Sequence, residues 1–419
     1  MATINKSLFI KGDIGTSPIN LGHLPVPMSQ GGMIVERLWT KSYISMVVGM
    51  LFLFTAFYML YPTLPLYIKE IGGNESQVGL AMGVFMLSAV IFRPVIGGLL
   101  DRFGRRPFIV IGIVLFAVAM YLYDWVGGII ALMGLRVLHG MTWAVSTTST
   151  LTAITDMIPT TRRGEGLGWS GMAMTLAMAI GPMFGLWVTE NLSFHSMFLF
   201  AFGLSVVALL LTFGAKMPFQ PQTSSRKIEL FEKSVLPVTI TVFFLFIAYG
   251  SITTFVPLFA DSIEVNSGTF FLVYAITLVL VRPIAGKLSD RHGESFIIVP
   301  ALVVTILALV ALSFSTGLVG VLIAAILYGI GFGSAQPALQ AATIRLVRSD
   351  RIGMANASFT TATDLGIGLG AIVLGWVSQH TNYQVLFTVS TMSVAFSLLM
   401  YMFLVKKLLD NKEVHNLTA

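Results

Sequence analysis

The chain has 419 residues, of which 56% are hydrophobic and 11% are charged, and it contains no cysteine. A soluble protein of this length would carry about 25% charged residues, so the composition excludes an ordinary soluble enzyme. Without cysteine, the protein has no disulfide, no thiolate metal site and no cysteine nucleophile. The net charge of +6 is compatible with nucleic-acid binding, but the charges follow a membrane topology instead, so we expect no nucleic-acid partner.

Twelve apolar segments follow one another along the chain. Each is long enough to cross a hydrocarbon core about 30 Å thick, at about 1.5 Å per helical residue. In chain order they lie near 42–68, 77–100, 107–123, 126–157, 164–189, 194–215, 235–259, 267–286, 295–314, 318–346, 352–378 and 383–405. We therefore predict an all-α membrane protein with twelve transmembrane helices.

The 25 Lys and Arg residues are distributed unevenly about these segments. If the N-terminus is cytoplasmic, 21 of them lie on the cytoplasmic side and only Lys69 lies outside. The remaining three, Arg93, Arg136 and Arg282, fall within segments. By the positive-inside rule this predicts a multi-pass protein of the cell (plasma) membrane with both termini in the cytoplasm. Residues 1–41 are polar and lack the apolar stretch of a signal peptide, so we expect a flexible cytoplasmic leader.

The second half of the sequence repeats the first. The segment from Arg93 to Gly104 matches the segment from Arg282 to Gly293 at seven of twelve positions. We call the offset from Arg93 to Arg282 the repeat offset. It predicts two six-helix halves of the same orientation, related by an axis along the membrane normal. The predicted divisions are two halves at 42–215 and 235–405, a cytoplasmic linker at 216–234 and a cytoplasmic tail at 406–419.

Two repeated halves, with Gly-x-x-x-Asp-Arg-x-Gly-Arg-Arg from Gly97 to Arg106, resemble the major facilitator superfamily. The strings Leu135–Gly140 and Gly181–Gly185 resemble the arginine motif and the antiporter motif of its twelve-span drug:proton antiporters. Arg93-Pro94 and the short strings Thr253–Leu258 and Asp364–Ile367 also resemble the staphylopine-type opine metallophore exporters. The resemblance implies the major facilitator fold, twelve helices in two repeats, and secondary transport by alternating access.

The motif after the second segment is predicted to form a cytoplasmic latch. The resemblance implies that it stabilises the outward-facing state, while positive-inside anchoring is the alternative. Asp101 is expected to accept hydrogen bonds from the N-terminal end of the eleventh helix and to pair with an arginine such as Arg162. The latch residues, with a weaker copy in the second half, are Gly97, Asp101, Arg102, Gly104, Arg105, Arg106, Asp290 and Arg291.

The antiporter motif comprises Gly181, Pro182 and Gly185. Proline removes a helical hydrogen bond and bends the chain, and small residues spaced by four allow close helix contact. A kink that helps to close the outer side and ordinary close packing are the two interpretations.

Asp364 is the only carboxylate that we place near the membrane midplane, about 12 residues or roughly 18 Å into its segment. Charged residues at this depth are functional candidates by default. We predict a proton-carrying or substrate-binding group, with a structural aspartate bonded to neighbouring threonines as the alternative. Arg136 is predicted to be its counter-charge on the facing wall. The proton gradient is then the energy source, and no cofactor or metal is expected.

Other candidates are side chains on segments expected to line a central cavity. Four residues of the fourth segment follow one helical stripe, which we expect to face that cavity: Arg136, His139, Trp143 and Thr147. The cavity set as a whole comprises Phe57, Tyr61, Arg93, His139, Trp143, Tyr249, Phe255, Arg282, Tyr328, Phe332 and Gln336. Three intramembrane arginines against one clear carboxylate favour substrates that carry carboxylates.

We therefore predict a secondary active transporter that acts as a monomer in the lipid bilayer on a small-molecule substrate. The expected activity is proton-coupled export of a small amphiphilic compound. Export of a carboxylate-rich opine metallophore, or uptake of an organic anion, is the alternative. A membrane-embedded enzyme is not expected, because no segment holds a Ser/His pair, a carboxylate dyad or a set of metal ligands.

Overall fold

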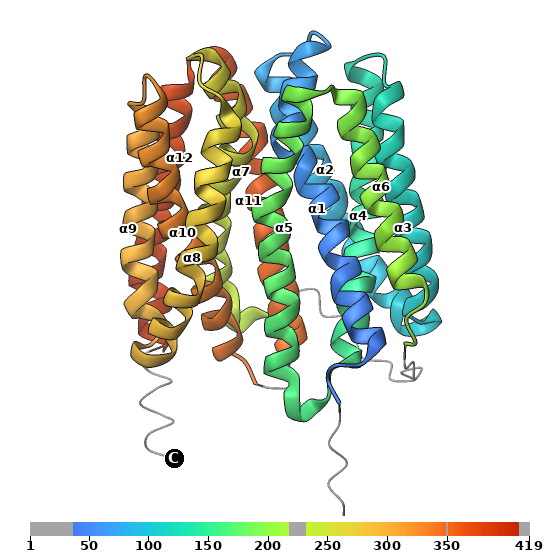
Figure 1. Ribbon diagram of the computed structural model, residues 1–419. Coiled ribbons are helices and arrows are strands. Elements are labelled where there is room, and N and C mark those ends of the chain that lie inside the picture. Colours follow the sequence, from blue (N-terminus) through green and yellow to red (C-terminus); the bar gives the residue numbers. More distant parts are fainter. Residues whose placement is uncertain (1–36, 218–231, 349–350, 410–419) are drawn as a thin grey trace, which may run out of the picture. The chain divides into compact units, whose positions relative to one another are not determined.

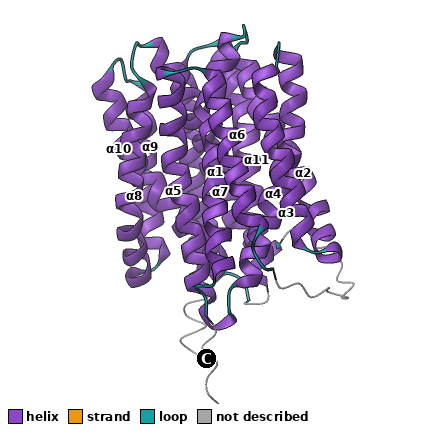
Figure 2. Ribbon diagram, turned by 45° about the vertical axis from the view of Figure 1, so that its right-hand side comes forward, coloured by secondary structure: helices purple, strands orange, loops and turns teal. Residues whose placement is uncertain are grey.

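The computed structural model describes residues 37–217, 232–348 and 351–409, and these residues are almost entirely helical (Figures 1 and 2). Contacts divide the chain into Met1–Arg37 and Leu38–Ala419, and all of the helices belong to the second unit. Most of the predicted leader, most of the predicted linker and the end of the predicted tail lie outside the described residues.

Twelve long helices follow one another in the described part of the chain. They are α1 (Lys41–Glu70), α2 (Glu75–Phe103), α3 (Arg105–Leu122), α4 (Ile129–Met157), α5 (Arg163–Asn191), α6 (Phe194–Phe213), α7 (Leu236–Ser262), α8 (Ser267–His292), α9 (Glu294–Ser313), α10 (Leu318–Arg345), α11 (Ile352–His380) and α12 (Tyr383–Met400). All twelve are long and apolar enough to cross a membrane, which confirms the predicted fold class.

Successive helices run in opposite directions through the bundle (Figure 1). We call the end where α1 begins and α12 ends the terminal end, and the end that carries the α1–α2 turn the distal end. Helices α1 to α6 form the N-terminal half and α7 to α12 the C-terminal half. At the boundary between the halves, α2 packs against α11, α5 against α8 and α1 against α7.

Local sequence signals explain where several helices start. Asn74 and Gln77 form a reciprocal capping box at the start of α2, which satisfies two backbone donors that a helix end leaves free. Gly104 and Gly293 separate α2 from α3 and α8 from α9, with φ of 87° and 84°. A side chain disfavours this left-handed region, so glycine is required at both turns. The two glycines are related by the repeat offset, so the repeat in the sequence is also a repeat of these turns.

Large apolar side chains remain exposed on the outside of the bundle. Ile130 is 90% exposed, Val319 72% and Phe403 69%. A soluble protein would not leave so many side chains of this kind in water. The exposed apolar surface is what a lipid bilayer would cover.

Candidate functional site

Asp364 of α11 is the one Asp or Glu that is buried among the described residues. Its Oδ2 lies 2.8 Å from Nη2 of Arg93 of α2, and the two side chains are 8% and 16% exposed. Arg93 also donates a long hydrogen bond of 3.5 Å from Nη1 to Oγ1 of Thr147 of α4. Because α2 and α11 belong to different halves, this buried ion pair joins the two halves directly.

Among the described residues, no hydrogen bond joins the Asp364 carboxylate to the neighbouring threonines Thr360 and Thr363. The Thr360 and Thr363 hydroxyls donate to the carbonyl oxygens of Asn356 and Phe359 in their own helix, at 3.0 Å each. A buried carboxylate that needs a partner from another helix is a stronger functional candidate than one satisfied locally.

The prediction that Arg136 is the counter-charge of Asp364 is wrong. Arg136 Nε donates to the Ala81 carbonyl oxygen at 2.9 Å, and Nη1 donates to the Tyr123 hydroxyl at 3.2 Å. Its guanidinium carbon lies 4.2 Å from the centre of the Phe85 ring. A carbonyl, a hydroxyl and a ring face therefore stabilise this cation inside the N-terminal half. Depth along a helix could be predicted from the sequence, but the arginine that faces α11 could not.

His139 is also packed within the N-terminal half. Its Nδ1 lies 2.9 Å from the Tyr123 hydroxyl, and its ring lies 4.9 Å from that of Phe116. The residue is fully buried, and its Nε2 has no hydrogen-bond partner among the described residues. The prediction of a stripe facing a cavity is therefore wrong for Arg136 and His139, because α2 and α3 cover this face of α4.

The second intramembrane arginine at the boundary between the halves is Arg282 of α8. Its Nη2 donates to Oε1 of Gln336 of α10 at 2.5 Å, and its Nη1 donates to the hydroxyl of Thr175 of α5. The same Nη2 lies 4.0 Å from Sδ of Met178. Nε is buried and has no partner in the described chain. Arg282 thus reaches across the boundary, as Arg93 does, but its hydrogen-bond acceptors are all neutral.

The two arginine clusters are equivalent under the repeat offset. The corresponding pairs are Arg93 with Arg282, Thr147 with Gln336, and Asp364 with Thr175. Each arginine therefore bonds through its guanidinium to an oxygen of its own half and to an oxygen of the other half, at matching positions. The clusters differ in charge, because only the first contains a carboxylate.

Aromatic side chains of both halves pack against one another inside the bundle. Phe57 of α1 stacks on Trp143 of α4 at 3.7 Å between ring centres. In the C-terminal half Tyr249 stacks on Phe332 at 4.8 Å. Tyr61 and Tyr249 meet across the boundary at 6.5 Å. Two more of the predicted cavity residues are fully buried, namely Phe255 of α7 and Tyr328 of α10.

The predicted latch is described only in part. Arg105 is 8% exposed, its Nε lies 2.9 Å from Oδ2 of Asp156, and its Nη1 donates to the Leu100 carbonyl oxygen at 2.8 Å. Arg106 Nη2 donates to the Phe213 carbonyl oxygen at 3.3 Å. These two arginines thus connect α3 to α2, α4 and α6 within the N-terminal half.

The remaining latch residues show no contact between the halves in the described part of the structure. Arg162, the predicted partner of Asp101, instead donates two hydrogen bonds to the Glu165 carboxylate, from Nε at 2.9 Å and from Nη2 at 2.8 Å. Arg102 lies over the Phe103 ring at 5.2 Å. A side chain at Gly97 would enter open space, and Arg291 is exposed. The side chains of Asp101 and Asp290 lie outside the described residues, so the latch stays a prediction.

The antiporter motif packs closely on α1. A Cβ at Gly181 would lie 2.6 Å from Cβ of Tyr58, and one at Gly185 would lie 2.6 Å from the Met59 carbonyl oxygen. Pro182 stays inside a continuous helix. Close packing of α5 on α1 therefore explains both glycines.

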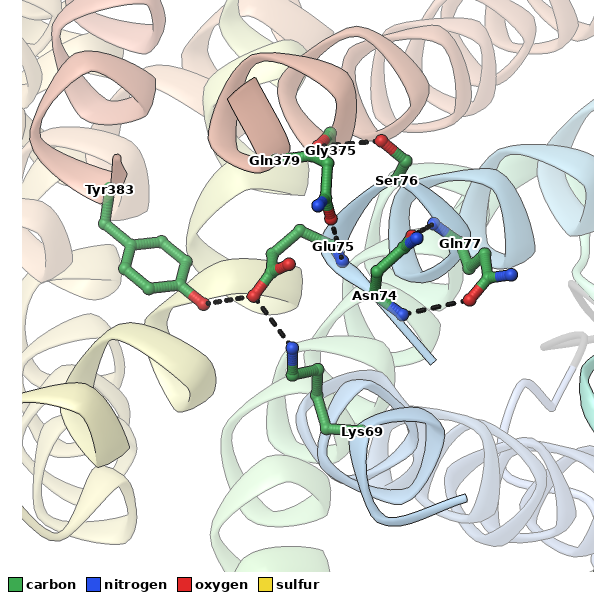
Figure 3. A network of polar contacts seen from close by, with 8 residues as sticks. All are labelled: Lys69, Asn74, Glu75, Ser76, Gln77, Gly375, Gln379 and Tyr383. Atoms are coloured by element: carbon green, nitrogen blue, oxygen red, sulfur yellow. Dashed lines mark hydrogen bonds and ion pairs between the residues drawn. The ribbon is translucent and has the colours of Figure 1, made fainter. Parts of the chain in front are cut away.

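Polar contacts join the two halves at the distal end (Figure 3). The Glu75 amide donates to Oε1 of Gln379 at 3.1 Å, and the Tyr383 hydroxyl donates to Oε1 of Glu75 at 3.3 Å. Lys69 pairs with the same carboxylate at 2.9 Å. A side chain at Gly79 would overlap the backbone of α11. Helix α2, which Lys69 joins to α1, is thus held against α11 and α12, and this side of the distal end is closed.

Sequence reasoning missed Thr175 and the Glu75 network. Thr175 is an ordinary polar residue in an apolar helix, and only the repeat offset that separates it from Asp364 could have marked it. In the sequence, Glu75 is an acidic residue in the first turn of a helix, where its charge interacts favourably with the helix dipole. Nothing in the sequence pairs it with Gln379 or Tyr383.

Comparison with known proteins agrees with the fold. A sequence model of the Major Facilitator Superfamily matches residues 46–370 and 266–417. The staphylopine export protein of Staphylococcus aureus is 28% identical over 373 residues, which cover 84% of this chain and 92% of that protein. The multidrug resistance protein MdtG of Citrobacter koseri is 25% identical over 383 residues, with coverage of 86% and 93%.

Solved transporters share the arrangement of helices. The nucleoside transporter NupG matches with a TM-score of 0.69 at 17% identity, over 86% of this chain and 98% of that chain. A bacterial homologue of the human lysosomal transporter Spinster, solved inward-facing and occupied, matches with a TM-score of 0.72 at 14% identity, over 88% and 97%. The family match extends over most of the chain and these folds agree with it, so the protein belongs to the Major Facilitator Superfamily and is a membrane transporter rather than an enzyme.

Proposed function

We propose that this transporter exports a small amphiphilic compound in exchange for protons, by alternating access between its two halves. The observation that carries the proposal is the buried Arg93–Asp364 ion pair, which crosses the boundary between the halves. The protein acts as a monomer, needs no cofactor besides the proton gradient, and has its terminal end in the cytoplasm.

The ion pair gives the proton a mechanical effect. While Asp364 is ionised, its attraction to Arg93 holds α2 against α11. A proton on the carboxylate removes its charge and leaves Arg93 without a counter-ion. A buried cation without its partner is strongly destabilised, so protonation weakens the contact between α2 and α11 and lets the two halves rearrange. In exchange for the exported compound, Asp364 takes up its proton from the distal side and releases it at the terminal end, where the ion pair forms again.

The surroundings of the ion pair suit an amphiphilic substrate. Aromatic rings from both halves meet near the boundary, as the Tyr61–Tyr249 contact shows. Such rings bind apolar and planar groups, while a few charged side chains orient the ligand. Two relatives of this chain are the multidrug resistance protein MdtG of Citrobacter koseri and the multi-drug resistance efflux pump PmrA of Streptococcus pneumoniae.

A second candidate function is export of a carboxylate-rich opine metallophore. It is favoured by the excess of Arg93, Arg136 and Arg282 over Asp364 inside the described bundle, and by the similarity to the staphylopine export protein. In that case the metal ion would be cargo, bound by the substrate and not by the protein.

Inside-out membrane vesicles test the coupling. Uptake of ethidium, a cationic probe, and of 1-naphthaleneacetate, an anionic probe, is measured with and without an imposed pH gradient. We expect a gradient to drive uptake of at least one probe by the wild-type protein and not by Asp364→Asn. Gradient-driven uptake by Asp364→Asn at the wild-type rate would place the coupling group elsewhere.

A further inference from the structure

The three arginines inside the bundle are stabilised in three different ways. Arg93 has the Asp364 carboxylate, and Arg136 has a carbonyl, a hydroxyl and the face of a ring. Arg282 has only the hydroxyl of Thr175 and the amide oxygen of Gln336 as hydrogen-bond acceptors. It is therefore the cation at the boundary between the halves that meets no carboxylate within the described residues.

The repeat shows what is missing at Arg282. In the first cluster the position across the boundary is Asp364, and the equivalent position in the second cluster is Thr175. A threonine hydroxyl accepts a hydrogen bond but leaves the positive charge of the guanidinium uncompensated. A buried charge without a counter-ion is costly unless a ligand supplies one.

The geometry of Arg282 fits a carboxylate. Its Nη1 and Nη2 donate to two separate neutral oxygens, those of Thr175 and Gln336. A carboxylate accepts both bonds of a guanidinium fork at once, and such charged pairs are roughly twice as strong as neutral hydrogen bonds. The unused Nε is a further donor at the same site.

Two tyrosines with unpartnered hydroxyls lie on α8 and α10, the helices that carry Arg282 and Gln336. Tyr274 and Tyr328 are fully buried, their rings are 5.6 Å apart, and neither hydroxyl has a hydrogen-bond partner among the residues described. Tyr58, Tyr249 and Tyr274 lie within electrostatic range of Arg282. Helices α8 and α10 therefore carry a guanidinium that can pair with an anion, two unpartnered hydroxyl groups and aromatic rings.

We infer that Arg282, with Thr175 and Gln336, forms a binding site for a carboxylate of the transported compound, which is accordingly an amphiphilic organic anion. This rests on the proposed function and assigns its substrate class. The proton site at Asp364 and the substrate site at Arg282 then occupy equivalent places in the two repeats. A carboxylate at Arg282 would contact α5 and α8, so it would act on the second pair of helices at the boundary.

Equilibrium binding to the full-length protein in detergent tests the site. The probes are 1-naphthaleneacetate and 1-naphthaleneacetamide, which differ only in the carboxylate. We expect the carboxylate to bind the wild-type protein and the amide to bind at least about tenfold more weakly. Arg282→Gln should lower the affinity for the carboxylate by about tenfold or more, with no effect on the amide. Lys287→Gln removes an exposed cation from the same helix and should leave both affinities unchanged.

A charge placed at Thr175 gives a second test that keeps Arg282. Thr175→Asp copies the first cluster and should neutralise Arg282, so carboxylate binding should fall by about tenfold or more. Thr175→Asn has nearly the same shape without the charge and should lower the affinity far less. Equal binding of the two probes to the wild-type protein, binding of neither, or full carboxylate binding by Arg282→Gln would overturn the inference.

These measurements separate the inference from the proposed function. Binding at equilibrium needs no gradient, so a failure of Asp364→Asn to abolish gradient-driven uptake would remove the coupling and leave the carboxylate site standing. Normal carboxylate binding by Arg282→Gln would remove the site and leave the coupling standing.

Discussion

Arg105 and Glu294 occupy equivalent positions at the start of α3 and α9, related by the repeat offset, and carry opposite charges. Their partners are equivalent too, since Arg105 pairs with Asp156 of α4 and Glu294 pairs with Arg345 of α10. The ion pair between the first helix turn and the neighbouring helix end is thus kept in both halves with its charges exchanged. The electrostatic contact, and not the individual residue type, is what the fold repeats.

Because the two ion pairs are equivalent with opposite polarity, exchanging the charges of Arg105 and Asp156 should restore most of the stability that a single substitution loses. Arg105→Glu places a second carboxylate against Asp156 and should lower the free energy of unfolding by about 2–4 kcal/mol, because Arg105 is almost buried. Asp156→Arg in the same chain recreates the polarity of the other half and should recover more than half of the loss. The melting temperature in detergent checks both. If the losses in free energy of the two single variants simply add in the double variant, the two residues are not energetically coupled and the prediction is wrong.

Asp364→Asn is expected to reach the membrane and to lose transport driven by a pH gradient, because the amide cannot exchange a proton. Counterflow exchange of a loaded probe should survive if the residue serves coupling alone. Both rates are measured in proteoliposomes with 1-naphthaleneacetate. Loss of counterflow with retained probe binding would instead show that the carboxylate is needed for the conformational change itself.

Arg136→Ala is expected to act on stability more than on coupling. It removes the donors to Ala81 and Tyr123 and the cation over the Phe85 ring, and it leaves a buried carbonyl and hydroxyl poorly satisfied. The loss should be about 2–4 kcal/mol in the free energy of unfolding. Arg136→Lys keeps the positive charge but lacks the planar guanidinium, so it should lower the free energy of unfolding by less than Arg136→Ala. If Arg136→Ala abolished gradient-driven transport without changing the melting temperature, Arg136 would take part in proton coupling and not only in stability.

Gly79→Val should hold the distal end open. A side chain at Gly79 would overlap the backbone of α11, so the closed contact between α2 and α11 cannot form. The chain has no cysteine, so one introduced cysteine reports by itself. Tyr61→Cys should react faster with a membrane-impermeant maleimide from the distal side when Gly79→Val is present. The control is Gly203→Val, since a side chain at Gly203 would meet open space. Equal rates in both backgrounds would contradict the expected opening.

The sequence by itself determined the number of helices, their order and the twofold repeat, because each rests on local information. A span needs a run of apolar residues, and Gly104 and Gly293 mark equivalent turns wherever the helices finally pack. The depth of Asp364 follows from counting along one helix. So does the presence of arginines at membrane depth.

Only the tertiary structure decided which charged groups meet. Arg93 and Arg136 both lie within apolar segments, yet the direction of each side chain depends on the rotation of its helix in the bundle. Rotation is set by packing against helices that are remote in the sequence, so no pattern within one segment reveals it. The same holds for Thr175, which became a site residue because α5 lies beside α8 and Arg282 needs a partner across the boundary.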